Sequence, residues 1–541
     1  MPSPSRKRLF PSPAQVVAIG LAFALSALSP AHAGDRDSKG KTKLPDRPLI
    51  ESFKTDSRPC GGTGAESARR QSIDGTGYGV VPDPALETYL NRIKDRLLQV
   101  SPAPNCAIRV YVIPQEHFAA AAAADGAIFL PLGLLRDLKN EDEIAAVMGH
   151  EIAHILKRHH ESDSFLKAQA NMLKAGDTLM GAYSMVQQFS GTAPAINGQT
   201  TMNIAEAVYA VSENVIAPSW TSKQEDEADL LGADLFIKAG YNKAAIGTMM
   251  AKLEDWEKKI AQRDAQKDAF VQASLQANAM SVMGAASSVM AAPSAASLGG
   301  LAANLAPGLI KSAASANKGE DHRPVAERRA DVIEYLGAFY RTSPRPALGA
   351  AQWLQQQSAP VFSNYAAAAR ARMLMEAGQM AQAAQLAAAG VSGPTANHAY
   401  PRLAMYEVAS RQGRPDAAAN LGAILRNPNP PIAGYRYAAA DSIKTGRLAE
   451  AAGYIDQANQ RYGTPLSFIP ESIKFYQQSG NPHKIQPLLA QCQAKGDKAM
   501  YAVCQSAAGG SSGSPAAQQN NNPFKGMGGL GSTPLRGLLG R

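Results

Sequence analysis

The sequence predicts an α+β protein in which a mainly helical domain with a small β-sheet is followed by an all-α region of repeated helix pairs. Only two short runs favour strands, at 108–113 and 127–130, and they lie among longer stretches whose apolar residues recur at helical spacing. A helical stretch at 141–158 contains the sequence His-Glu-Ile-Ala-His. Beyond residue 345 the chain is alanine-rich, and glycines recur there at intervals of 35, 33 and 34 residues.

Residues 1–33 have the pattern of a secretory signal peptide. Three basic residues at 6–8 precede an apolar run at 16–28, and Ala31-His32-Ala33 offers a cleavage site of small residues. The apolar run is too short for a membrane-spanning helix. The pattern therefore predicts export, and the polar stretch at 34–75, interrupted by Gly and Pro, is predicted to be a flexible lead-in.

Net charge and cysteine count limit the partners and the fold. Without the signal peptide the formal net charge falls from +9 to +6, a mild surplus that suits anionic membrane surfaces and gives no argument for nucleic acid. Export permits disulfides, and the four cysteines form two candidate pairs, Cys60 with Cys106 and Cys492 with Cys504. None of the cysteines has the spacing of zinc ligands.

The first domain is expected over residues 76–345. An amphipathic helix at 84–100 precedes the two strands, and the helix with His-Glu-Ile-Ala-His follows them. Insertions at 163–220 and 259–320 are rich in small residues, and the second carries no charged residue from 269 to 310. The sequence allows four interpretations of the second insertion: a lid, an amphipathic membrane segment, a packed helix pair or a partly disordered segment.

The stretch at 141–158 has the features of a metal-binding helix. Asn140 is a good N-cap, and Glu143 can complete a capping box. His150 and His154 lie one turn apart and face the same way, so both imidazoles can bind one ion. Glu151 lies beside them, where its carboxylate can take a proton from a water molecule on that ion.

Two residues compete for the third ligand position. His160 follows His154 at the metzincin spacing, although Lys157 stands where that arrangement conventionally turns at a glycine. Alternatively Glu225 binds the ion, and Asp229, one turn further along the same face, accepts an N–H from a ligating histidine. The acidic stretch around Glu225 is also compatible with a solvated helix face.

Three motifs together resemble the HtpX/BepA-type zinc metallopeptidases, which are gluzincins related to the CAAX prenyl peptidase. They are the helix at 141–158, the Glu-x-x-Ala-Asp segment at 225–229 followed by Ala-Gly-Tyr at 239–241, and the stretch Asp-His-Arg-Pro-Val-Ala-Glu-Arg at 321–328. The resemblance covers roughly residues 80–340. It implies a mainly helical gluzincin metallopeptidase domain with a small β-sheet.

The resemblance also implies roles for individual residues. One zinc ion per chain would be bound by His150, His154 and Glu225. Glu151 would be the catalytic base, and Asp229 would support a ligating histidine from behind.

Further residues take their expected roles from the same resemblance. His322 would be a second catalytic residue that stabilises the oxyanion or occupies the open position on the metal, and Arg328 would brace this region. The substrate would pair with the strand formed by Ala127, Ile128, Phe129 and Leu130. Ala119 stands where members of the family usually carry an asparagine that can help to hold the oxyanion, which puts full proteolytic efficiency in doubt.

The helical region at 346–505 resembles a tetratricopeptide-like solenoid over residues 362–496. Its period is marked by glycines, each followed five residues later by a small or aliphatic residue. The pairs are Gly378 with Ala383, Gly413 with Ala418, Gly446 with Ala451, and Gly480 with Ile485. The tail at 506–541, rich in Gly, Ser, Asn and Gln, is expected to be disordered.

The resemblances imply an exported, periplasmic, zinc-dependent endopeptidase that hydrolyses peptide bonds of misfolded or misassembled envelope proteins. The repeats would dock the substrate or the outer-membrane assembly machinery, and peripheral membrane contact is a further expectation. The alternative is a periplasmic chaperone or assembly scaffold with a latent metal site, which Ala119 and a metal-capping His322 would favour. A zinc site that only stabilises the fold would leave Glu151 without a task.

Overall fold

The computed structural model describes most of the chain between residues 44 and 496. The described residues are 44–54, 58, 60–61, 66–75, 77–116, 118–123, 125–161, 220–259, 261–262, 323–341, 346–496, 501, 504–505 and 507–508. The predicted signal peptide, nearly all of both insertions, most of the tail and His322 lie outside them. Among the described helices, none combines the length and the apolar character that crossing a membrane requires.

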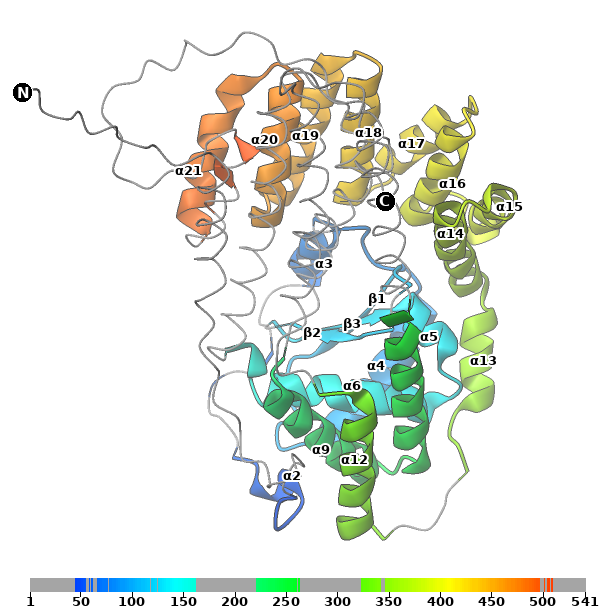
Figure 1. Cartoon of the computed structure of the whole chain (residues 1–541), viewed down its shortest axis with the longest axis vertical. Helices are drawn as coiled ribbons and strands as arrows, with labels where there is room; N and C mark the ends of the chain where they lie inside the picture. Colours follow the sequence, from blue (N-terminus) through cyan, green and yellow to red (C-terminus); the bar gives the residue numbers. More distant parts are fainter. Residues whose placement is uncertain are drawn as a thin grey trace, which may run out of the picture. The chain divides into compact units, whose positions relative to one another are not determined.

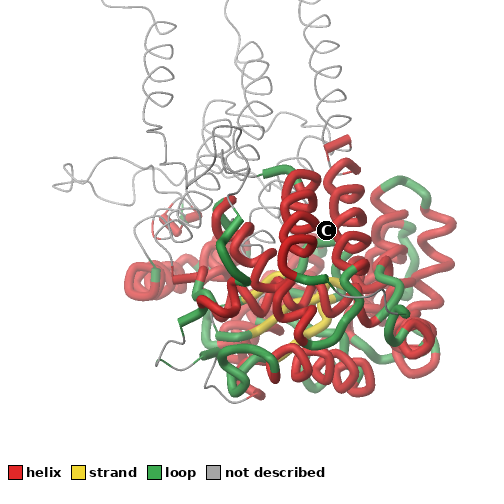
Figure 2. The backbone as a smooth tube through the Cα atoms, turned by 90° about the horizontal axis from the view of Figure 1, so that it is seen from below, coloured by secondary structure: helices red, strands yellow, loops and turns green. Residues whose placement is uncertain are grey.

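The sheet has three strands in the order β1-β3-β2. β1 (Arg109–Ile113) runs parallel to β3 (Ala127–Pro131), with Tyr111 opposite Phe129, and β2 (Ala121–Ala122) is antiparallel to β3. Figure 2 shows the strands grouped together among the helices. The two predicted strands are thus present, while the alanine-rich passage between them supplies a third.

Helices α4 (Pro84–Gln99), α5 (Leu132–Asp137), α6 (Glu141–Leu156), α9 (Ser222–Lys238) and α12 (Val325–Phe339) form the rest of this domain, together with a helical stretch at 244–259. All residues of α6 except His150 are buried, because α4, α9 and the sheet contact it from different sides (Figure 1). A helix enclosed in this way belongs to the core of its domain. The mainly helical domain with a small sheet is therefore confirmed.

The prediction of a flexible lead-in is wrong for the described part of 34–75. This part contains α2 (Leu49–Ser52) and α3 (Glu66–Asp74), and a disulfide joins Cys60 to Cys106. The amide of Ile50 donates to the carboxylate of Asp234 at 2.9 Å. These partners lie far away in the sequence, so composition alone could not indicate them.

Beyond residue 346 the described chain is helical. Its helices are α13 (Ala350–Ser358), α14 (Pro360–Glu376), α15 (Met380–Gly390), α16 (Ala399–Arg411), α17 (Ala417–Leu425), α18 (Ile432–Lys444), α19 (Leu448–Tyr462), α20 (Ile469–Gln478) and α21 (Ile485–Lys495). The indole of Trp353 in α13 donates to the carbonyl of Leu138 and stacks on Tyr89. α13 therefore packs on the first domain, and the boundary at 346 stays a prediction.

Helices α14 to α21 contact one another in consecutive pairs. The chain turns within each pair at a glycine with positive φ, and these are the periodic glycines Gly378, Gly413, Gly446 and Gly480. Glycine adopts this conformation without steric penalty, which explains why the period is marked by this residue. The tetratricopeptide-like character of these pairs stays a prediction.

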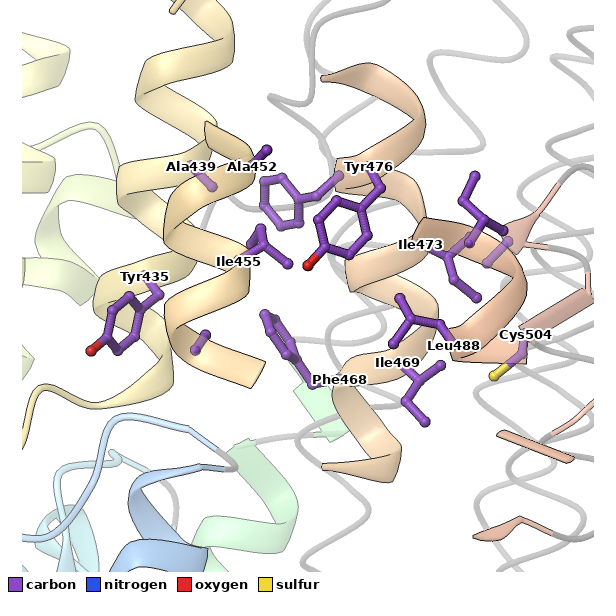
Figure 3. Close-up of a cluster of buried hydrophobic side chains, with 14 of the residues drawn as sticks. Tyr435, Ala439, Ala452, Ile455, Phe468, Ile469, Ile473, Tyr476, Leu488 and Cys504 are labelled. Atoms are coloured by element: carbon purple, nitrogen blue, oxygen red, sulfur yellow. The ribbon is translucent and has the colours of Figure 1, made fainter. Parts of the chain in front are cut away.

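The last helix pairs share an apolar core. Figure 3 shows Ile455 of α19 facing Tyr476 and Phe468, with Leu488 of α21 on the other side of α20. Cys504 belongs to the same cluster and forms a disulfide with Cys492. Both cysteine pairings predicted from the sequence are therefore confirmed.

Candidate metal centre

The site is built where α6 crosses α9, and two glycines set the distance between these helices. A Cβ atom on Gly232 would lie 2.8 Å from the backbone nitrogen of His150, and one on Gly149 would lie 2.9 Å from the carbonyl oxygen of Gly232. Real Cβ atoms do not approach backbone this closely. The absence of side chains at these positions therefore lets α9 bring its acidic residues up to the histidines of α6.

Each of the two helices begins at a side-chain cap. The side chain of Asn140 accepts from the amide of Glu143 at 2.9 Å, as predicted, but the Glu143 carboxylate accepts from the amide of Lys139 at 2.6 Å. The reciprocal bond of the expected capping box is thus displaced by one residue. α9 has a complete capping box, formed by Thr221 and Gln224.

Three predicted ligands converge at this crossing. The Nε2 atoms of His150 and His154 are 3.0 Å apart, and they lie 3.6 Å from Oε2 and from Oε1 of Glu225, respectively. Ligand atoms placed tetrahedrally at about 2.0–2.1 Å from a zinc ion lie about 3.4 Å from one another. Two imidazole nitrogens and a carboxylate at these separations therefore fit zinc, with a fourth corner left for water.

The competing third ligand is not part of this group. His160 lies in a short 3₁₀ helix after α6 (His159–Glu161), and the cluster of possible metal donors found in the described part of the chain contains Glu225 instead. The side chain of Glu225 is only 13% exposed and lies 2.7 Å from the guanidinium of Arg328. The solvated acidic face that the sequence also allowed is therefore excluded for Glu225.

Asp229 lies behind His150. Its Oδ1 is 2.9 Å from Nδ1 of His150, and its two carboxylate oxygens accept from Arg328 at 2.8 Å each. Burial alone would lower the pKa of His150, but the hydrogen bond and charge of Asp229 raise it to about 9. Burial would raise the pKa of Asp229, whereas Arg328 and His150 hold it well below its usual range. Asp229 is therefore an ionised acceptor that directs Nε2 of His150 toward the ligand cluster.

His154 is held by a partner that sequence reasoning missed. Its Nδ1 lies 2.8 Å from Nδ1 of His159, and the indole of Trp220 stacks on its ring at 4.4 Å. Burial, followed by the charges of its neighbours, lowers the pKa of His154 well below its ordinary value, which keeps the ring neutral. The side chain of His159 is itself buried, with 5% of its surface exposed.

Glu151 lies in α6 beside the ligands and is buried. Its Oε2 has no hydrogen-bond partner among the described residues. Burial raises the pKa of this carboxyl to about 7, with His150 and Arg328 opposing the shift and Glu225 adding to it. A carboxylate with this pKa and a vacant oxygen can accept and return a proton near neutral pH.

The predicted substrate strand needs a correction. Ala127–Leu130 belongs to β3, which is paired with β1 on one side and with β2 at Ile128 and Phe129 on the other. Within the described sheet β3 therefore has a neighbouring strand on each side. Within the described sheet the outer strand on the side of α6 is β2, whose two alanines gave no strand signal, and Ala119 lies just before it.

Only residues 323–328 of the third sequence motif, at 321–328, lie in the described part of the chain. His322 lies outside the described residues, whereas the neighbouring Arg323 forms ion pairs of 2.6 Å with Asp226 and with Asp331. One of these carboxylates is on α9 and the other on α12. Together with Arg328 they tie α12 to the helix that carries Glu225.

Known proteins share the part of the chain that forms this site. The sequence model of peptidase family M48 matches residues 84–312. The chain carries an M48 peptidase domain. The beta-barrel assembly-enhancing protease of Escherichia coli K12 is 26% identical over 177 residues, which are 32% of this chain and 34% of that protein.

Two further relatives match a similar share of the chain. The beta-barrel assembly-enhancing protease of Yersinia pestis is 24% identical over 186 residues, 34% of this chain and 35% of that protein. The mitochondrial metalloendopeptidase OMA1 of Schizosaccharomyces pombe is 25% identical over 167 residues, 31% and 43% respectively. The match thus spans about a third of the bacterial relatives and under half of the fission yeast protein.

Proposed function

We propose that the chain is an exported zinc-dependent endopeptidase that hydrolyses peptide bonds of misfolded or misassembled envelope proteins. The observation that carries this proposal is the cluster of donor atoms from His150, His154 and Glu225, in which the two Nε2 atoms are 3.0 Å apart and each lies 3.6 Å from a different carboxylate oxygen of Glu225. Its dimensions fit a tetrahedral zinc site with one open corner. The match to peptidase family M48 supports the same chemistry.

The residues of the chain divide the work of hydrolysis among them. When bound, zinc would lower the pKa of water toward neutrality and polarise the scissile carbonyl. Glu151 accepts the proton of the attacking water at its vacant Oε2 and returns it to the leaving amine. Asp229 and Arg328 keep His150 and Glu225 in place while the charge at the centre changes. His322, next to Arg323, would add a donor for the oxyanion.

Substrate would bind as an extended segment along the outer side of β2. An edge strand offers main-chain hydrogen bonds to an added strand, and these bonds tolerate many side chains. Such a mode requires the substrate to be locally unfolded. A peptidase that uses it would therefore act on misfolded chains rather than on folded proteins.

The site of action and the partners are part of the same proposal. The basic-apolar N-terminus and the two disulfides support export to an oxidising compartment such as the periplasm. The helix pairs of 360–495 would dock the substrate or the outer-membrane assembly machinery, as the names of two bacterial relatives suggest. Peripheral membrane contact is a further element of the proposal.

A chaperone or assembly scaffold with a latent metal site is the second candidate function. Ala119 favours it, because a methyl group just before β2 cannot donate a hydrogen bond to an oxyanion. In that case the repeats would carry the function, and the metal centre would cleave slowly or not at all.

Cleavage of an unfolded protein separates the two candidates. Purified full-length chain should degrade casein, and a zinc chelator should stop the degradation until zinc is added back. The Glu151→Gln variant is the matched control for a contaminating protease. Failure of the zinc-loaded protein to degrade casein, at any pH between 6 and 8, would favour the scaffold.

A further inference from the structure

Two residues outside the ligand set form a chain of contacts that ends on His154. Nδ1 of His154 lies 2.8 Å from Nδ1 of His159, and Nε2 of His159 lies 3.3 Å from the Oε2 atom of Glu227. Lys157 lies 3.2 Å from the same oxygen. The Glu227 carboxylate therefore ends the chain of contacts as an acceptor that lies between an imidazole and an ammonium group.

The direction of the hydrogen bonds follows from what His154 must do. A histidine that binds a metal through Nε2 carries its proton on Nδ1. That proton is donated to Nδ1 of His159, which therefore acts as acceptor and carries its own proton on Nε2. The Nε2 proton then points at Glu227. His154 is therefore a donor, His159 accepts at Nδ1 and donates from Nε2, and Glu227 is an acceptor.

The backbone is shaped to place His159 there. α6 ends at Leu156, and Arg158 then adopts a left-handed conformation with φ of 52°. Residues other than glycine adopt this conformation only at an energetic cost. The turn brings the ring of His159 back onto His154, and the side chain of Gln224 donates to its carbonyl at 3.1 Å.

We propose that His159, held by Glu227, is a positioning residue that fixes the ring of His154 for metal binding. The inference rests on the zinc site of the proposed function. Asp229 fixes the ring of His150 from α9, and the pair of His159 and Glu227 does the same for His154. The two histidine ligands are thus oriented independently. The Asp229 carboxylate contacts His150 directly, whereas the Glu227 carboxylate acts on His154 through the imidazole of His159.

Zinc affinity of the metal-free, full-length protein tests the inference. Its dissociation constant is measured by competition with a chromophoric chelator for wild type, His159→Leu and His159→Asn. Leucine and asparagine have nearly the same shape, but only asparagine offers an oxygen where Nδ1 of His159 lies. We expect His159→Leu to weaken zinc binding by about 10–100-fold, and His159→Asn to recover most of that loss. His160→Leu is the matched control and should bind zinc like wild type.

Two readouts separate orientation from folding. The melting temperature of the metal-free protein should be the same for the leucine and asparagine variants, and the visible spectrum of the cobalt-substituted protein should change only in the leucine variant. If His159→Leu does not fold, Glu227→Ala takes its place, because the Glu227 side chain is partly exposed, and it should weaken zinc binding in the same direction.

Three outcomes would be decisive. Wild-type zinc affinity in His159→Leu, or in Glu227→Ala where the first variant fails to fold, would overturn the inference while leaving the endopeptidase proposal intact. Weakened binding in a protein that never degrades casein would support the positioning role and refute the proposed function. A wild-type protein without zinc affinity would overturn both.

Discussion

Replacing Gly232 by alanine tests whether the close crossing of α6 and α9 sets the geometry of the metal centre. The added Cβ would lie 2.8 Å from the backbone nitrogen and 2.9 Å from Cα of His150. Backbone atoms of a buried helix cannot rotate away, so the helices must separate. Reaching the 3.4 Å of ordinary contact requires about 0.6 Å, which is large beside the 3.6 Å that separates Glu225 from each histidine.

The expected effects follow from that displacement. Overpacking of a well-packed contact costs about 1–3 kcal/mol, and the better helix propensity of alanine returns about 1 kcal/mol. Gly337→Ala is the matched control, because Gly337 lies inside α12, is exposed and would have no atom within 4 Å of its Cβ. Relative to this control, Gly232→Ala should be less stable by about 1–3 kcal/mol.

Zinc affinity reports the geometry more directly than stability does. A shift of 0.6 Å in the position of Glu225 relative to the histidines should weaken zinc binding at least tenfold, or about 1.4 kcal/mol. Melting temperature and chelator competition measure the two effects on the same sample. The reasoning would be refuted if Gly232→Ala gained as much stability as Gly337→Ala and bound zinc like wild type.

Three further predictions address the site and the lead-in. Glu151→Gln should retain zinc but lose at least about 100-fold in casein hydrolysis; undiminished hydrolysis would contradict its role as base. Asp229→Asn should weaken zinc binding by about 10–100-fold in a chelator competition, and an unchanged dissociation constant would show that the contact to His150 is dispensable. Burial raises the pKa of Asp74 to about 6, above its ordinary 3.8, so the folded state prefers the protonated form and stability is lost as pH rises from about 4 to 6. Asp74→Asn should therefore raise the free energy of unfolding at pH 7.5 by about 1–2 kcal/mol after allowance for solvent screening, and the melting temperature with it. The substitution should have little effect at pH 4, and equal effects at both pH values would contradict the prediction.

The grouping of His150, His154 and Glu225 could be predicted because its signals are local. His150 and His154 lie one turn apart on a helix with a recognisable N-cap, and Glu225 and Asp229 lie one turn apart on another. Gly232 lies on that second helix, and the structure brings it against His150. Helical spacing therefore predicts most of the site geometry. Only the choice of α9 as the partner helix required the third motif, at 321–328.

The residues that were missed depend on contacts without a local signal. His159 follows His154 by five residues and would point elsewhere on a continuing helix, but the left-handed turn at Arg158 reverses the chain. The two-residue strand β2 consists of alanines, which favour helices, and it is a strand only because β3 lies beside it. The position of the sheet edge could therefore not be read from the sequence.

The contacts of α2 and Cys60 bear on how the protein can be shortened for biochemical work. A chain that began at residue 76, where composition places the start of the first domain, would leave Cys106 with an unpaired thiol. It would also remove the Ile50 amide from the buried carboxylate of Asp234, whose pKa burial already raises. Because Asp234 belongs to the same helix as Glu225, trimming this apparently dispensable leader would disturb the scaffold of the metal ligands. Shortened versions should therefore start ahead of α2 and be prepared under oxidising conditions.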